Sequence, residues 1–582
     1  MTPQSTSIYR RRHEVVLEHG HDHLTGLLGH QPFRTRADNL LALGELAPRE
    51  GVSYAFVYFN VENFKHYNQR YGFEAGDELI LHVSHFIQEA FPGSDVARFS
   101  ADQFVALVMA DEVEQGVRAV RSAFRREHKD ISIWLRAGYY VITADDRDAG
   151  VAFDHAKTAC DELRGRRDVY LREYDTELRH EIAWRRYVLE HFEEALANGN
   201  IQAWCQPIIR VATGETCDVE ALARWMDPNE GLVPPNRFVP VLEEARLIHL
   251  LDLTVLRDLC RTCREYHDRG IPYIPMSFNI SKLDFELCDI VDEVTAIVDE
   301  YDLPHELISV EITESTLAGN QEFLRGEVDR FREAGFEVWI DDFGSGYSSL
   351  NVLKNYQFDL IKVDMGFIRD FNKSEKSRII LTKIIDMAKE LGVKTLVEGV
   401  ETQEQYDYLR SLGCGRVQGW LFGKPMPLPS SVEGAANSTH PNVELIAKRN
   451  FYENVGRVNL MRPDPRPSAG HYLPSDVAAC IIRRRNGRYE YLNTNELYEQ
   501  FLIDAGIGSF EDSEAGINDP SDPRNAAFVD VIDRCAESGE WERYHLVTDD
   551  VEHVVRMRMI DQIEEFDAIA VLSIVDEVVE RE

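Results

Sequence analysis

The sequence predicts a multidomain α/β protein whose central part folds as a (β/α) barrel. Short apolar strands alternate with helical patterns between residues 201 and 427. Oxygen-bearing side chains also recur in this part of the chain, most of them at or just after a β-like run: Glu220, Asn279, Glu311, Asp341, Asp342, Glu398 and Gln418. Because a (β/α) barrel collects the carboxyl ends of its strands on one face, we expect these donors to meet there.

The length of 582 residues is too great for one hydrophobic core and indicates three or four folding units. We expect an N-terminal extension at 1–21, an α/β domain at 22–175, a linker helix at 176–198, the barrel domain at 199–430, a second linker at 431–470 and a small α+β domain at 471–582. The helix at 176–198 has Asp175 or Thr176 as candidate N-caps and Asn198-Gly199 as a stop signal. Whether it is a signalling helix or simply the first helix of the barrel domain stays open.

Periodicity predicts the elements within each domain. In the first domain, β-rich runs at 53–59, 103–109 and 131–142 alternate with amphipathic stretches such as 78–91. In the barrel domain, the β-like runs at 307–311, 338–342 and 394–398 each close on a carboxylate. In the last domain, Asn486-Gly487 between two β-rich runs is typical of a hairpin with a type I′ turn, and a helix and strands at 551–559 and 568–575 follow. A Pro-rich stretch at 462–467 marks the second linker.

Composition excludes several classes of protein. Acidic residues number 101 against 63 basic ones, and this net charge of -38 argues against a general surface for nucleic acid polymers. The sequence has no stretch of 18 apolar residues and its start lacks a secretory signal core, so we expect a cytoplasmic protein without membrane insertion. Nine scattered cysteines fit reduced thiols, and the one CxxC, at Cys260 and Cys263, is expected to be inert rather than zinc-binding.

Several strings of the barrel region carry a family resemblance. They are Gln206-Pro207, Glu220-Ala221-Leu222-Ala223-Arg224-Trp225, Asn279-Ile280-Ser281, Glu311-Ile312-Thr313-Glu314, Asp341-Asp342-Phe343-Gly344-Ser345-Gly346-Tyr347, Lys362-Val363-Asp364, Glu398-Gly399-Val400-Glu401 and Gln418-Gly419-Trp420. Together they make the region from about 187 to 428 resemble an EAL domain, the family of phosphodiesterases that linearise the bacterial second messenger cyclic di-GMP. The resemblance implies a (β/α)8-type, TIM-like barrel and hydrolysis of cyclic di-GMP to linear pGpG.

The residue types also suit this chemistry directly. Two divalent cations about 4 Å apart can activate a bridging water and stabilise the leaving oxygen of a phosphodiester. Mg²⁺ and Mn²⁺ prefer carboxylate, amide and water oxygens, which matches the donor set without any need for His or Cys. Asp341 and Asp342 would repel each other as neighbours, so the pair itself indicates cations between or beside them.

The resemblance also implies roles for individual residues. Glu220, Asn279, Glu311 and Asp341 would hold one cation, and Asp341, Asp342 and Glu398 the other. Lys362 would act with Glu220 and Glu398 in catalysis by orienting the nucleophilic water, and a lysine beside two cations should have a lowered pKa. Gln206, Arg224 and Gln418 would contact the substrate, while Glu314 and Glu401 would support the loop after Asp342. Trp420 stands where the family usually has Tyr.

The N-terminal domain resembles a GGDEF domain, the diguanylate cyclase fold, from Asp22-His23-Leu24-Thr25-Gly26-Leu27 onward. Its catalytic positions differ from the family pattern, with Asn60 in place of a metal-binding Asp and Ser100-Ala101-Asp102-Gln103-Phe104 at the hairpin that usually carries two glycines. We therefore expect no cyclisation. The base-recognition positions Asn68 and Asp77 remain, which leaves a regulatory GTP site open beside a purely structural or dimerising role.

The last domain resembles a PAS domain loosely, in its Asn-Gly hairpin, helix and terminal strands. The combined hypothesis is a metal-dependent cyclic di-GMP phosphodiesterase with two bound Mg²⁺ or Mn²⁺ ions, a catalytically inactive GGDEF domain and, by resemblance, a homodimeric state. Two alternatives come from other classes: a receptor that binds cyclic di-GMP without hydrolysing it, and a signalling scaffold with a vestigial barrel. The intact donor set argues against both.

Overall fold

The computed structural model describes residues 20–128, 132–317, 321–344, 349–369, 371, 374–428, 443–460, 477–548 and 551–580. The chain forms two compact units, Met1–Tyr187 and Val188–Glu582. Across these described ranges, no helix combines the length and apolar character that a membrane span requires. Most of the extension expected at 1–21 and the Pro-rich stretch at 462–467 lie outside the described residues.

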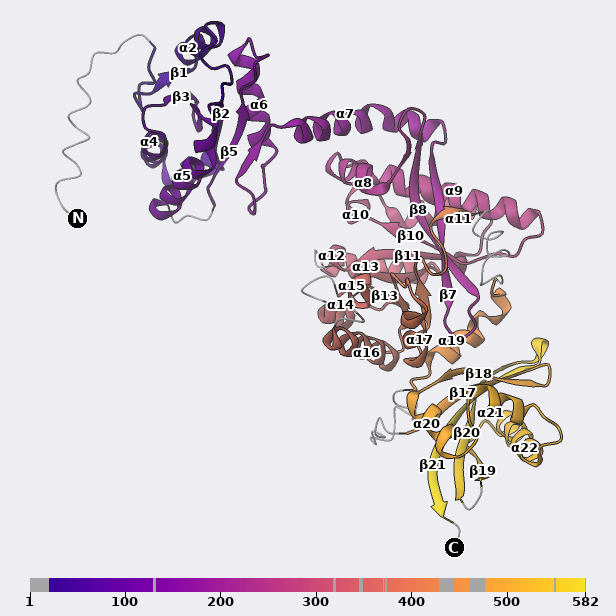
Figure 1. Ribbon diagram of the computed structural model, residues 1–582. Helices are drawn as coiled ribbons and strands as arrows, with labels where there is room; N and C mark the ends of the chain where they lie inside the picture. Colours follow the sequence, from indigo (N-terminus) through magenta and orange to yellow (C-terminus); the bar gives the residue numbers. More distant parts are fainter. Residues whose placement is uncertain are drawn as a thin grey trace. The chain divides into compact units, whose positions relative to one another are not determined.

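The first unit is built on a six-stranded sheet with the order β1-β3-β4-β2-β5-β6 (Figure 1). Its strands are β1 (Leu28–Gly29), β2 (Tyr54–Glu62), β3 (Asp95–Ser100), β4 (Gln103–Met109), β5 (Trp134–Val141) and β6 (Leu171–Glu173). The central strand β2 pairs antiparallel with β4 and β5. The three strands predicted for this domain are thus present, and the third begins later than expected.

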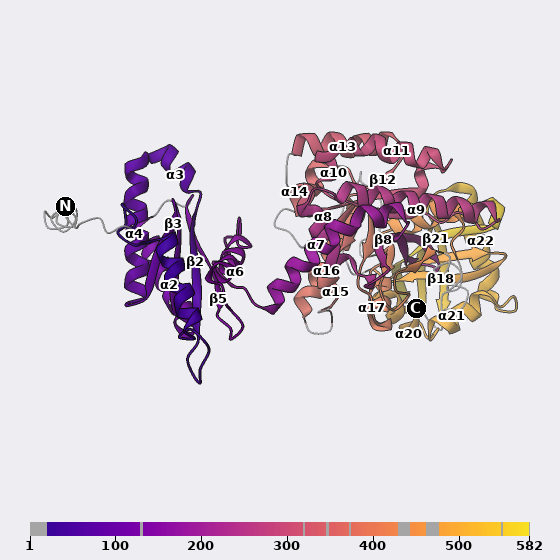
Figure 2. The same cartoon turned by 90° about the horizontal axis from the view of Figure 1, so that it is seen from above.

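Helices cover both faces of this sheet (Figures 1 and 2). They are α2 (His30–Ala42), α3 (Phe64–Tyr71), α4 (Phe73–Ala90), α5 (Val113–Glu127) and α6 (Ala149–Asp161). Val57 and Phe59 of β2 join a buried cluster with α4 and α5, whereas Phe56 and Tyr58 join a second cluster with α2 and α6. The alternation of side chains along β2 therefore buries both faces, as in a central strand.

The long helix α7 (Thr176–Ala197) follows, and the boundary between the two units falls within it. Its start is capped by Asp175, whose carboxylate accepts a hydrogen bond of 2.8 Å from the Leu178 amide. Gly199 lies just beyond its end with a φ of 67°, the left-handed conformation that favours glycine after a helix. Both signals match the caps predicted from the sequence.

The second unit contains the predicted barrel. Its sheet has the order β16-β7-β15-β14-β13-β12-β11-β10-β8-β9, and an additional pairing of β7 with β8 closes the ring. The ring strands are β7 (Ile201–Arg210), β8 (Thr216–Asp227), β10 (Met276–Ile280), β11 (Ile308–Thr313), β12 (Glu337–Phe343), β13 (Leu360–Val363), β14 (Lys394–Val397) and β15 (Arg416–Gln418), with β9 (Gly231–Val233) and β16 (Met426–Pro427) attached outside the ring.

One strand of the ring departs from the all-parallel arrangement of a (β/α)8 barrel. β7 runs antiparallel to both of its neighbours, β8 and β15, whereas the other ring strands run parallel to one another. The reason is local: a tight turn at 211–215, closed by a bond from the Arg210 amide to the Glu215 carbonyl, leads directly from β7 into β8. A connection this short can only join antiparallel strands.

Helices surround the ring (Figures 1 and 2). They are α8 (Pro235–Glu244), α9 (Ile248–Asp268), α10 (Asp284–Leu287), α11 (Ile290–Glu300), α12 (Glu314–Leu317), α13 (Gln321–Glu333), α14 (Ser349–Asn355), α15 (Met365–Arg369), α16 (Glu375–Glu390) and α17 (Gln403–Ser411). Cys260 and Cys263 lie buried and unoxidised on α9.

Side chains fill the barrel in layers, because alternate residues of each strand point inward. On β12 the inward positions are Glu337, Trp339 and Asp341, which contact Arg449, the apolar barrel cluster and Lys362 in turn. The middle layer is apolar and consists of the buried residues Ile208, Cys217, Trp339, Leu360 and Leu396. It separates two charged layers, one at the amino ends of the parallel strands and one at their carboxyl ends.

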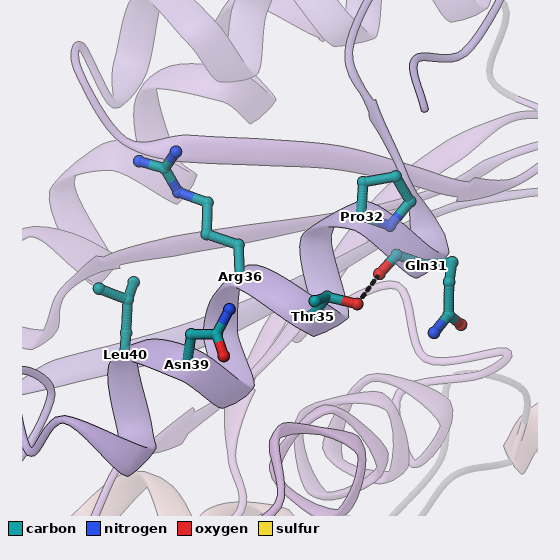
Figure 3. A pocket seen from close by; sticks show the side chains of 6 residues that line it. All are labelled: Gln31, Pro32, Thr35, Arg36, Asn39 and Leu40. Atoms are coloured by element: carbon teal, nitrogen blue, oxygen red, sulfur yellow. Dashed lines mark hydrogen bonds between the residues drawn. The ribbon is translucent and has the colours of Figure 1, made fainter. Parts of the chain in front are cut away.

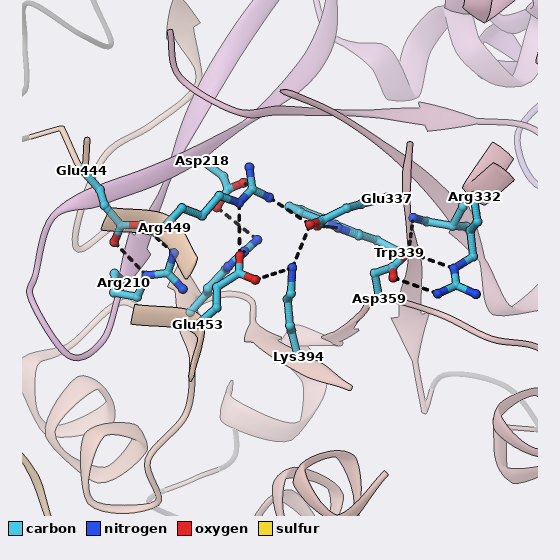
Figure 4. A network of polar contacts seen from close by, with 12 residues as sticks. Arg210, Asp218, Arg332, Glu337, Trp339, Asp359, Lys394, Glu444, Arg449 and Glu453 are labelled. Atoms are coloured by element: carbon cyan, nitrogen blue, oxygen red, sulfur yellow. Dashed lines mark hydrogen bonds and ion pairs between the residues drawn. The ribbon is translucent and has the colours of Figure 1, made fainter. Parts of the chain in front are cut away.

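The layer at the amino ends is an ionic network (Figure 4). It balances four basic against four acidic side chains: Arg210, Lys394, Arg416 and Arg449 with Asp218, Glu337, Glu444 and Glu453. Arg416, only 1% exposed, contacts Asp218 at 3.0 Å and Glu453 at 2.8 Å. Arg210 contacts Glu444 at 2.7 Å. Every charge in this layer has an opposite charge beside it, which offsets the cost of burial.

Part of this network comes from the segment expected to be a linker. Within 431–470 the structure describes residues 443–460, which form η3 (Ile446–Lys448) and α19 (Arg449–Arg457). Glu444, Arg449 and Glu453 face the barrel, while Phe451 and Val455 pack against the C-terminal domain. This portion of the range is folded and not a linker, because its helix has a charged face and an apolar face that both find partners.

The network predicts acid sensitivity. Burial alone raises the pKa of Glu337, but attraction by Arg449, Lys394 and Arg416 outweighs it and lowers the pKa to about 2. A carboxyl group with a lowered folded-state pKa stabilises the protein above its unfolded pKa and loses that contribution as the pH falls toward the folded value. We therefore expect the free energy of unfolding to drop between pH 4.5 and about 2, and Glu337→Gln to flatten that drop. Urea unfolding at a series of pH values measures it; identical slopes for both proteins would contradict the assignment.

The C-terminal domain is a five-stranded antiparallel sheet with the order β18-β17-β21-β20-β19. Its elements are β17 (Ala479–Arg485), β18 (Arg488–Thr494), α20 (Glu496–Asp504), α21 (Phe510–Ile517), α22 (Pro523–Ser538), β19 (Glu542–Thr548), β20 (Val551–Ile563) and β21 (Ala568–Glu580). The predicted hairpin is confirmed, with φ values of 50° at Asn486 and 73° at Gly487 that fit a type I′ turn. Helices α20 to α22 pack on one face of the sheet and α19 on the other.

Candidate active site

The charged layer at the carboxyl ends of the strands gathers most of the predicted site residues around one lysine. The Lys362 ammonium, 1% exposed, lies 2.8 Å from a Glu398 oxygen, 3.1 Å from Asp341 and 3.2 Å from Glu220, and it also contacts Glu311. These residues come from five different ring strands or their ends. The convergence expected from the sequence is therefore present in the structure.

Strand register explains how residues so far apart in sequence meet. Asn279 of β10 pairs with Glu311 of β11, and Gln206 of β7 pairs with Glu220 of β8. The parallel registers of β11 with β12, β12 with β13 and β13 with β14 place residues of these strands at the same height in the barrel. Strands β10 to β15 end at or just before this level, so the inward residues at their carboxyl ends lie beside one another and beside Glu220 of β8.

Amide side chains bind the carboxylates within this layer. Gln418 donates hydrogen bonds to Glu220 Oε2 at 2.5 Å and to Gln206 Oε1 at 3.1 Å. Asn279 donates to Glu220 Oε1 at 3.3 Å. Two buried acceptors, Glu311 Oε1 and Gln418 Oε1, have no hydrogen-bond partner among the described residues. These oxygens are free to accept a further ligand.

A second group of carboxylates lies at the rim. Asp341, Asp342 and Glu398 each offer an oxygen, and the three atoms lie within 4.8 Å of one another. Asp342 has a φ of 55°, a left-handed conformation that is uncommon for Asp and turns the chain directly after Asp341. Adjacent residues of a strand normally point to opposite faces, and this turn lets both carboxylates serve one site.

The charges of this layer are strongly unbalanced. Five carboxylates, those of Glu220, Glu311, Asp341, Asp342 and Glu398, face the single ammonium of Lys362 among the described residues. Burial raises the pKa of Glu311 well above its usual range, and the attraction of Lys362 offsets only part of the effect. Burial likewise raises the pKa of Glu398 to about 7. The layer therefore holds more carboxyl groups than one ammonium can keep ionised, and bound cations would stabilise their charged forms.

The pKa of Lys362 is set by its carboxylate partners in this structure. Burial lowers it, but the carboxylates of Asp341, Glu220 and Glu311 outweigh burial and raise the pKa well above its ordinary value. The immediate partners of the ammonium are carboxylates, which stabilise its charged form. Lys362 therefore keeps its proton and acts as a hydrogen-bond donor to Glu220 and Glu311. The lowered pKa predicted for a lysine beside two cations stays a prediction.

The remaining predicted residues lie at different distances from this centre. Glu314 accepts a hydrogen bond of 3.1 Å from the Gly344 amide and so holds the start of the loop after Asp342, whose residues 345–348 are outside the described ranges. The Arg224 guanidinium donates to the Ala223 carbonyl and lies over the Trp204 ring, and no direct bond joins it to the described carboxylates. Glu401 is exposed and its backbone amide bonds to Gln405. Trp420 is also exposed, with Lys424 over its ring.

The donor set fits hard divalent cations. Carboxylate and amide oxygens are the ligands that Mg²⁺ and Mn²⁺ select, and the surplus of negative charge and the free oxygens of Glu311 and Gln418 suit their binding. Asn279 would have to present its amide oxygen in place of the NH₂ group that now faces Glu220.

Comparisons with known families identify two domains in the chain. The sequence matches the family model described as EAL domain over residues 189–425 and that described as diguanylate cyclase, GGDEF domain, over residues 19–168. The chain carries a GGDEF domain and an EAL domain in tandem. The closed ring with its antiparallel β7 is the barrel of this EAL domain, and Lys362 with its carboxylates lies at the carboxyl ends of the barrel's parallel strands.

The chain is similar in sequence to several named bacterial proteins. The chain is 32% identical over 430 residues to the cyclic di-GMP phosphodiesterase NbdA of Pseudomonas aeruginosa, covering 71% of this chain and 53% of that protein. It is 29% identical over 439 residues to the bifunctional diguanylate cyclase/cyclic di-GMP phosphodiesterase MucR of the same organism, covering 73% and 62%. It is 31% identical over 385 residues to the cyclic di-GMP phosphodiesterase PdeR of Escherichia coli K12, covering 64% and 57%. The matches thus span between 53% and 62% of these relatives.

The GGDEF domain places its predicted nucleotide residues on two helices. Asn68 lies on α3, and its buried Oδ1 has no hydrogen-bond partner among the described residues. A Cβ at Gly76 would lie 1.8 Å from this oxygen, so only glycine at position 76 lets α4 pack this closely against the Asn68 side chain. Asp77 follows at the exposed surface of α4. The two positions therefore stand next to each other.

A feature of the GGDEF domain that sequence reasoning missed lies beside Asn60. The buried guanidinium of Arg136 on β5 donates to Asn60 Oδ1 at 3.4 Å and pairs with Asp161 at 3.4 Å. The available signal was a charged residue within the apolar run Trp134–Val141. The ionic network of the EAL barrel was missed in the same way, although Asp218, Arg416 and Lys394 each stand within or beside an apolar strand.

A shallow hollow follows α2 of the GGDEF domain (Figure 3). Gln31, Pro32, Thr35, Arg36, Asn39 and Leu40 line it. The Thr35 hydroxyl donates to the Gln31 carbonyl at 3.0 Å, and Arg36 pairs with Asp95 at 2.6 Å. The hydroxyl of Thr35 and the guanidinium of Arg36 have partners, and the hollow lies on an open helix surface, so we assign it no role.

Proposed function

We propose that this chain is a metal-dependent phosphodiesterase that hydrolyses cyclic di-GMP to linear pGpG. The observation that carries the proposal is the excess of acidic groups in the layer at the carboxyl ends of the parallel strands (the upper layer), where five carboxyl groups share one ammonium. The layer at the amino ends (the lower layer) is balanced, with four basic and four acidic side chains. Selection for stability alone would favour balance in both layers, so the imbalance supports a cation-binding and catalytic role.

The residues would divide the work as follows. Glu220, Asn279, Glu311 and Asp341 would hold one cation, and Asp341, Asp342 and Glu398 the second. When bound, such a pair supplies Lewis-acid stabilisation of the phosphate and of the attacking water. Lys362 would hold a water or phosphate oxygen by donating a hydrogen bond from its ammonium, and Gln206 and Gln418 would orient the substrate through their linked amides.

Arg224 has a separate part in the proposal. Its half-buried guanidinium is held by the Ala223 carbonyl and the Trp204 ring. Burial lowers the pKa of Arg224, but the ordinary pKa of an arginine is far above neutral pH. It therefore stays charged and can donate to a substrate phosphate.

The direct test uses the purified full chain with Mg²⁺ or Mn²⁺ and cyclic di-GMP. We expect linear pGpG as product by chromatography, and loss of turnover with EDTA that returns when Mg²⁺ or Mn²⁺ is restored. Saturable binding of cyclic di-GMP without any hydrolysis in either metal would replace the proposal with the receptor alternative. Neither binding nor hydrolysis would favour the scaffold alternative.

We further propose that the GGDEF domain makes no cyclic di-GMP. The buried Arg136 guanidinium beside Asn60 supports this, because a fixed positive charge next to that position disfavours a divalent cation there. GTP incubated with the chain and Mg²⁺ is expected to yield no cyclic di-GMP. Detectable synthesis would refute this part of the proposal.

The GTP site at Asn68 and Asp77 is proposed as regulatory. The unpartnered Asn68 oxygen supports it, since a guanine can supply the missing donor. A ligand that binds the folded state raises the melting temperature, so GTP should raise it in the wild type and not in Asn68→Ala. If GTP changes neither the melting temperature nor the phosphodiesterase rate, the domain has a structural role only.

The PAS-like assignment of the C-terminal domain and the homodimer also remain proposals. The strand order β18-β17-β21-β20-β19, with helices between β18 and β19, supports a PAS-like arrangement. Light scattering coupled to size exclusion tests the homodimer, for which a mass of one chain at micromolar concentration would be decisive against it.

A further inference from the structure

Two carboxyl groups lie in contact where α10 packs on α9, outside the donor set of the proposed active site. Asp252 belongs to α9, and Asp284 is the first residue of α10. Asp284 is fully buried, and the carboxyl groups of the two residues form a hydrogen bond with each other. Among the described residues, no Lys, Arg or His forms an ion pair with either of them. No cation therefore neutralises the pair.

The turn between β10 and α10 depends on Asp284. Asp284 Oδ2 accepts a hydrogen bond of 2.7 Å from the Ser281 amide, and the Asp284 amide donates one of 3.1 Å to the Ser281 carbonyl. The Ser281 hydroxyl accepts a further bond of 3.3 Å from the Leu283 amide. These bonds close the turn two residues after Asn279, which is a proposed cation ligand.

Strand pairing shows why this turn matters for Asn279. β10 pairs with β11 through Asn279 as far as Ile280, whereas its pairing with β8 ends at Phe278. On the side of β8, Asn279 therefore lies beyond the last paired residue. Since the turn at 281–284 follows almost directly, its geometry helps to set the direction of the Asn279 side chain.

The second oxygen of Asp284 shows where a proton lies. Asp284 Oδ1 is buried and receives no hydrogen bond from an amide, hydroxyl or basic group of the described residues. The neighbouring carboxyl group of Asp252 can donate to Asp284 only when it is protonated, because an ionised carboxylate has no donor. Two ionised carboxylates in contact would also repel each other. The Ser281 amide stabilises the negative charge on Asp284, so the proton belongs to Asp252.

Burial favours this protonation. It raises the pKa of Asp252 well above its usual range, and the negative charge of Asp284 raises the pKa further. Glu243 of α8 acts in the same direction on both carboxyl groups. Burial also raises the pKa of the Cys288 thiol, just after α10, to about 11, so this thiol is neutral at physiological pH. None of these groups favours an ionised Asp252.

We propose that Asp252 is a positioning residue of the phosphodiesterase: it donates its proton in a hydrogen bond to Asp284, and the pair holds the turn that presents Asn279 to the cation site. The part that concerns Asn279 rests on the proposed function, whereas the protonated pair does not. Loss of the proton places two negative charges in contact, which pushes α10 away from α9 and loosens the turn. Asn279 is then held less firmly, and cations bind more weakly.

Infrared spectroscopy of the full chain detects the proton directly, because a protonated carboxyl group absorbs apart from ionised carboxylates. The difference between wild type and Asp252→Asn at neutral pH should contain one protonated-carboxyl band. Glu311 and Glu398, whose pKa values burial also raises, are present in both proteins and cancel. Asp268→Asn, at the exposed end of the same helix, is the matched control and should give no such band. Absence of the band for Asp252→Asn overturns the proposal.

Mg²⁺ titration of the full chain by calorimetry tests the positioning role and needs no substrate. Asp252→Asn keeps a donor for Asp284 in its amide group, so Mg²⁺ affinity should stay within about twofold of wild type. Asp252→Leu removes the donor and should weaken Mg²⁺ binding by about tenfold. Equal affinity of Asp252→Leu and wild type rejects the positioning role. A wild type that binds no Mg²⁺ contradicts the proposed function instead, and the infrared band still decides whether Asp252 is protonated.

Urea unfolding at acidic, neutral and alkaline pH adds a readout that a merely structural role would not change. Above 3.8, the ordinary pKa of Asp, the wild type loses stability as the pH rises toward the raised folded-state pKa, because the folded chain holds the proton more strongly than the unfolded chain. Asp252→Asn lacks this loss, so its urea midpoint relative to wild type should rise with pH. A difference that is independent of pH overturns the assignment of the proton. If Asp252→Leu fails to fold, this measurement and the infrared band decide the matter.

Discussion

Glu220→Ala is expected to reduce cyclic di-GMP hydrolysis by at least about a thousandfold, roughly 4 kcal/mol of transition-state stabilisation. Glu220 lies at the centre of the upper layer, where its two oxygens contact Lys362, Asn279 and Gln418. Removing it takes away a carboxylate of the proposed cation site and leaves these three donors without their shared acceptor. Steady-state rates at saturating metal and substrate measure the loss.

Two companion variants separate the charge of Glu220 from its hydrogen bonds. Glu220→Gln keeps an acceptor for Lys362 but removes the negative charge, so it should remain severely impaired if the charge holds a cation. Glu300→Ala, an exposed position at the end of α11, should retain wild-type turnover. Circular dichroism should show the same fold in all three proteins. Near-normal activity of Glu220→Ala would remove Glu220 from the catalytic centre.

The second large effect is expected at the opposite end of the barrel. Arg416→Met should destabilise the folded chain by about 3–5 kcal/mol, because it leaves Asp218 and Glu453 buried without their main counter-charge. Arg416 also lies over the Trp339 ring at 5.3 Å, so packing is lost as well. Urea unfolding followed by tryptophan fluorescence measures the change.

The matched control is another Arg–Asp ion pair of the same domain whose side chains are more exposed to solvent. Arg332 pairs with Asp359 at 3.3 Å, with side chains 33% and 23% exposed (Figure 4). Exposed pairs contribute about 0–1 kcal/mol, so Arg332→Met should have a small effect. Equal losses for both variants would show that burial of the network is not what makes Arg416 important.

The sequence predicted the barrel and its site residues because strand periodicity and end position are local properties. The β-like runs that close on Glu311, Asp341 and Glu398 correspond to β11, β12 and β14. The antiparallel course of β7 was not predicted, since it depends on the turn at 211–215, which resembles many short connections in the sequence.

The sequence does not show which buried charged or polar side chains contact each other, because the partners lie far apart along the chain. Asp218 and Arg416 are separated by almost the length of the domain, and their contact depends on ring closure through β7. Asn60 and Arg136 lie on neighbouring strands whose register only the sheet reveals. The helix at 449–457 was not predicted because its amphipathic pattern is short and a proline-rich stretch follows it at 462–467.

The lower ionic network has a consequence for any truncation. The family match to the EAL domain ends at residue 425, but Glu444, Arg449 and Glu453 lie beyond it. A fragment that ends at residue 425 would leave the buried guanidinium of Arg210 without Glu444 and that of Arg416 without Glu453. The autonomous folding unit thus extends at least to α19, and excising the enzyme portion by homology alone should yield an insoluble or weakly folded product.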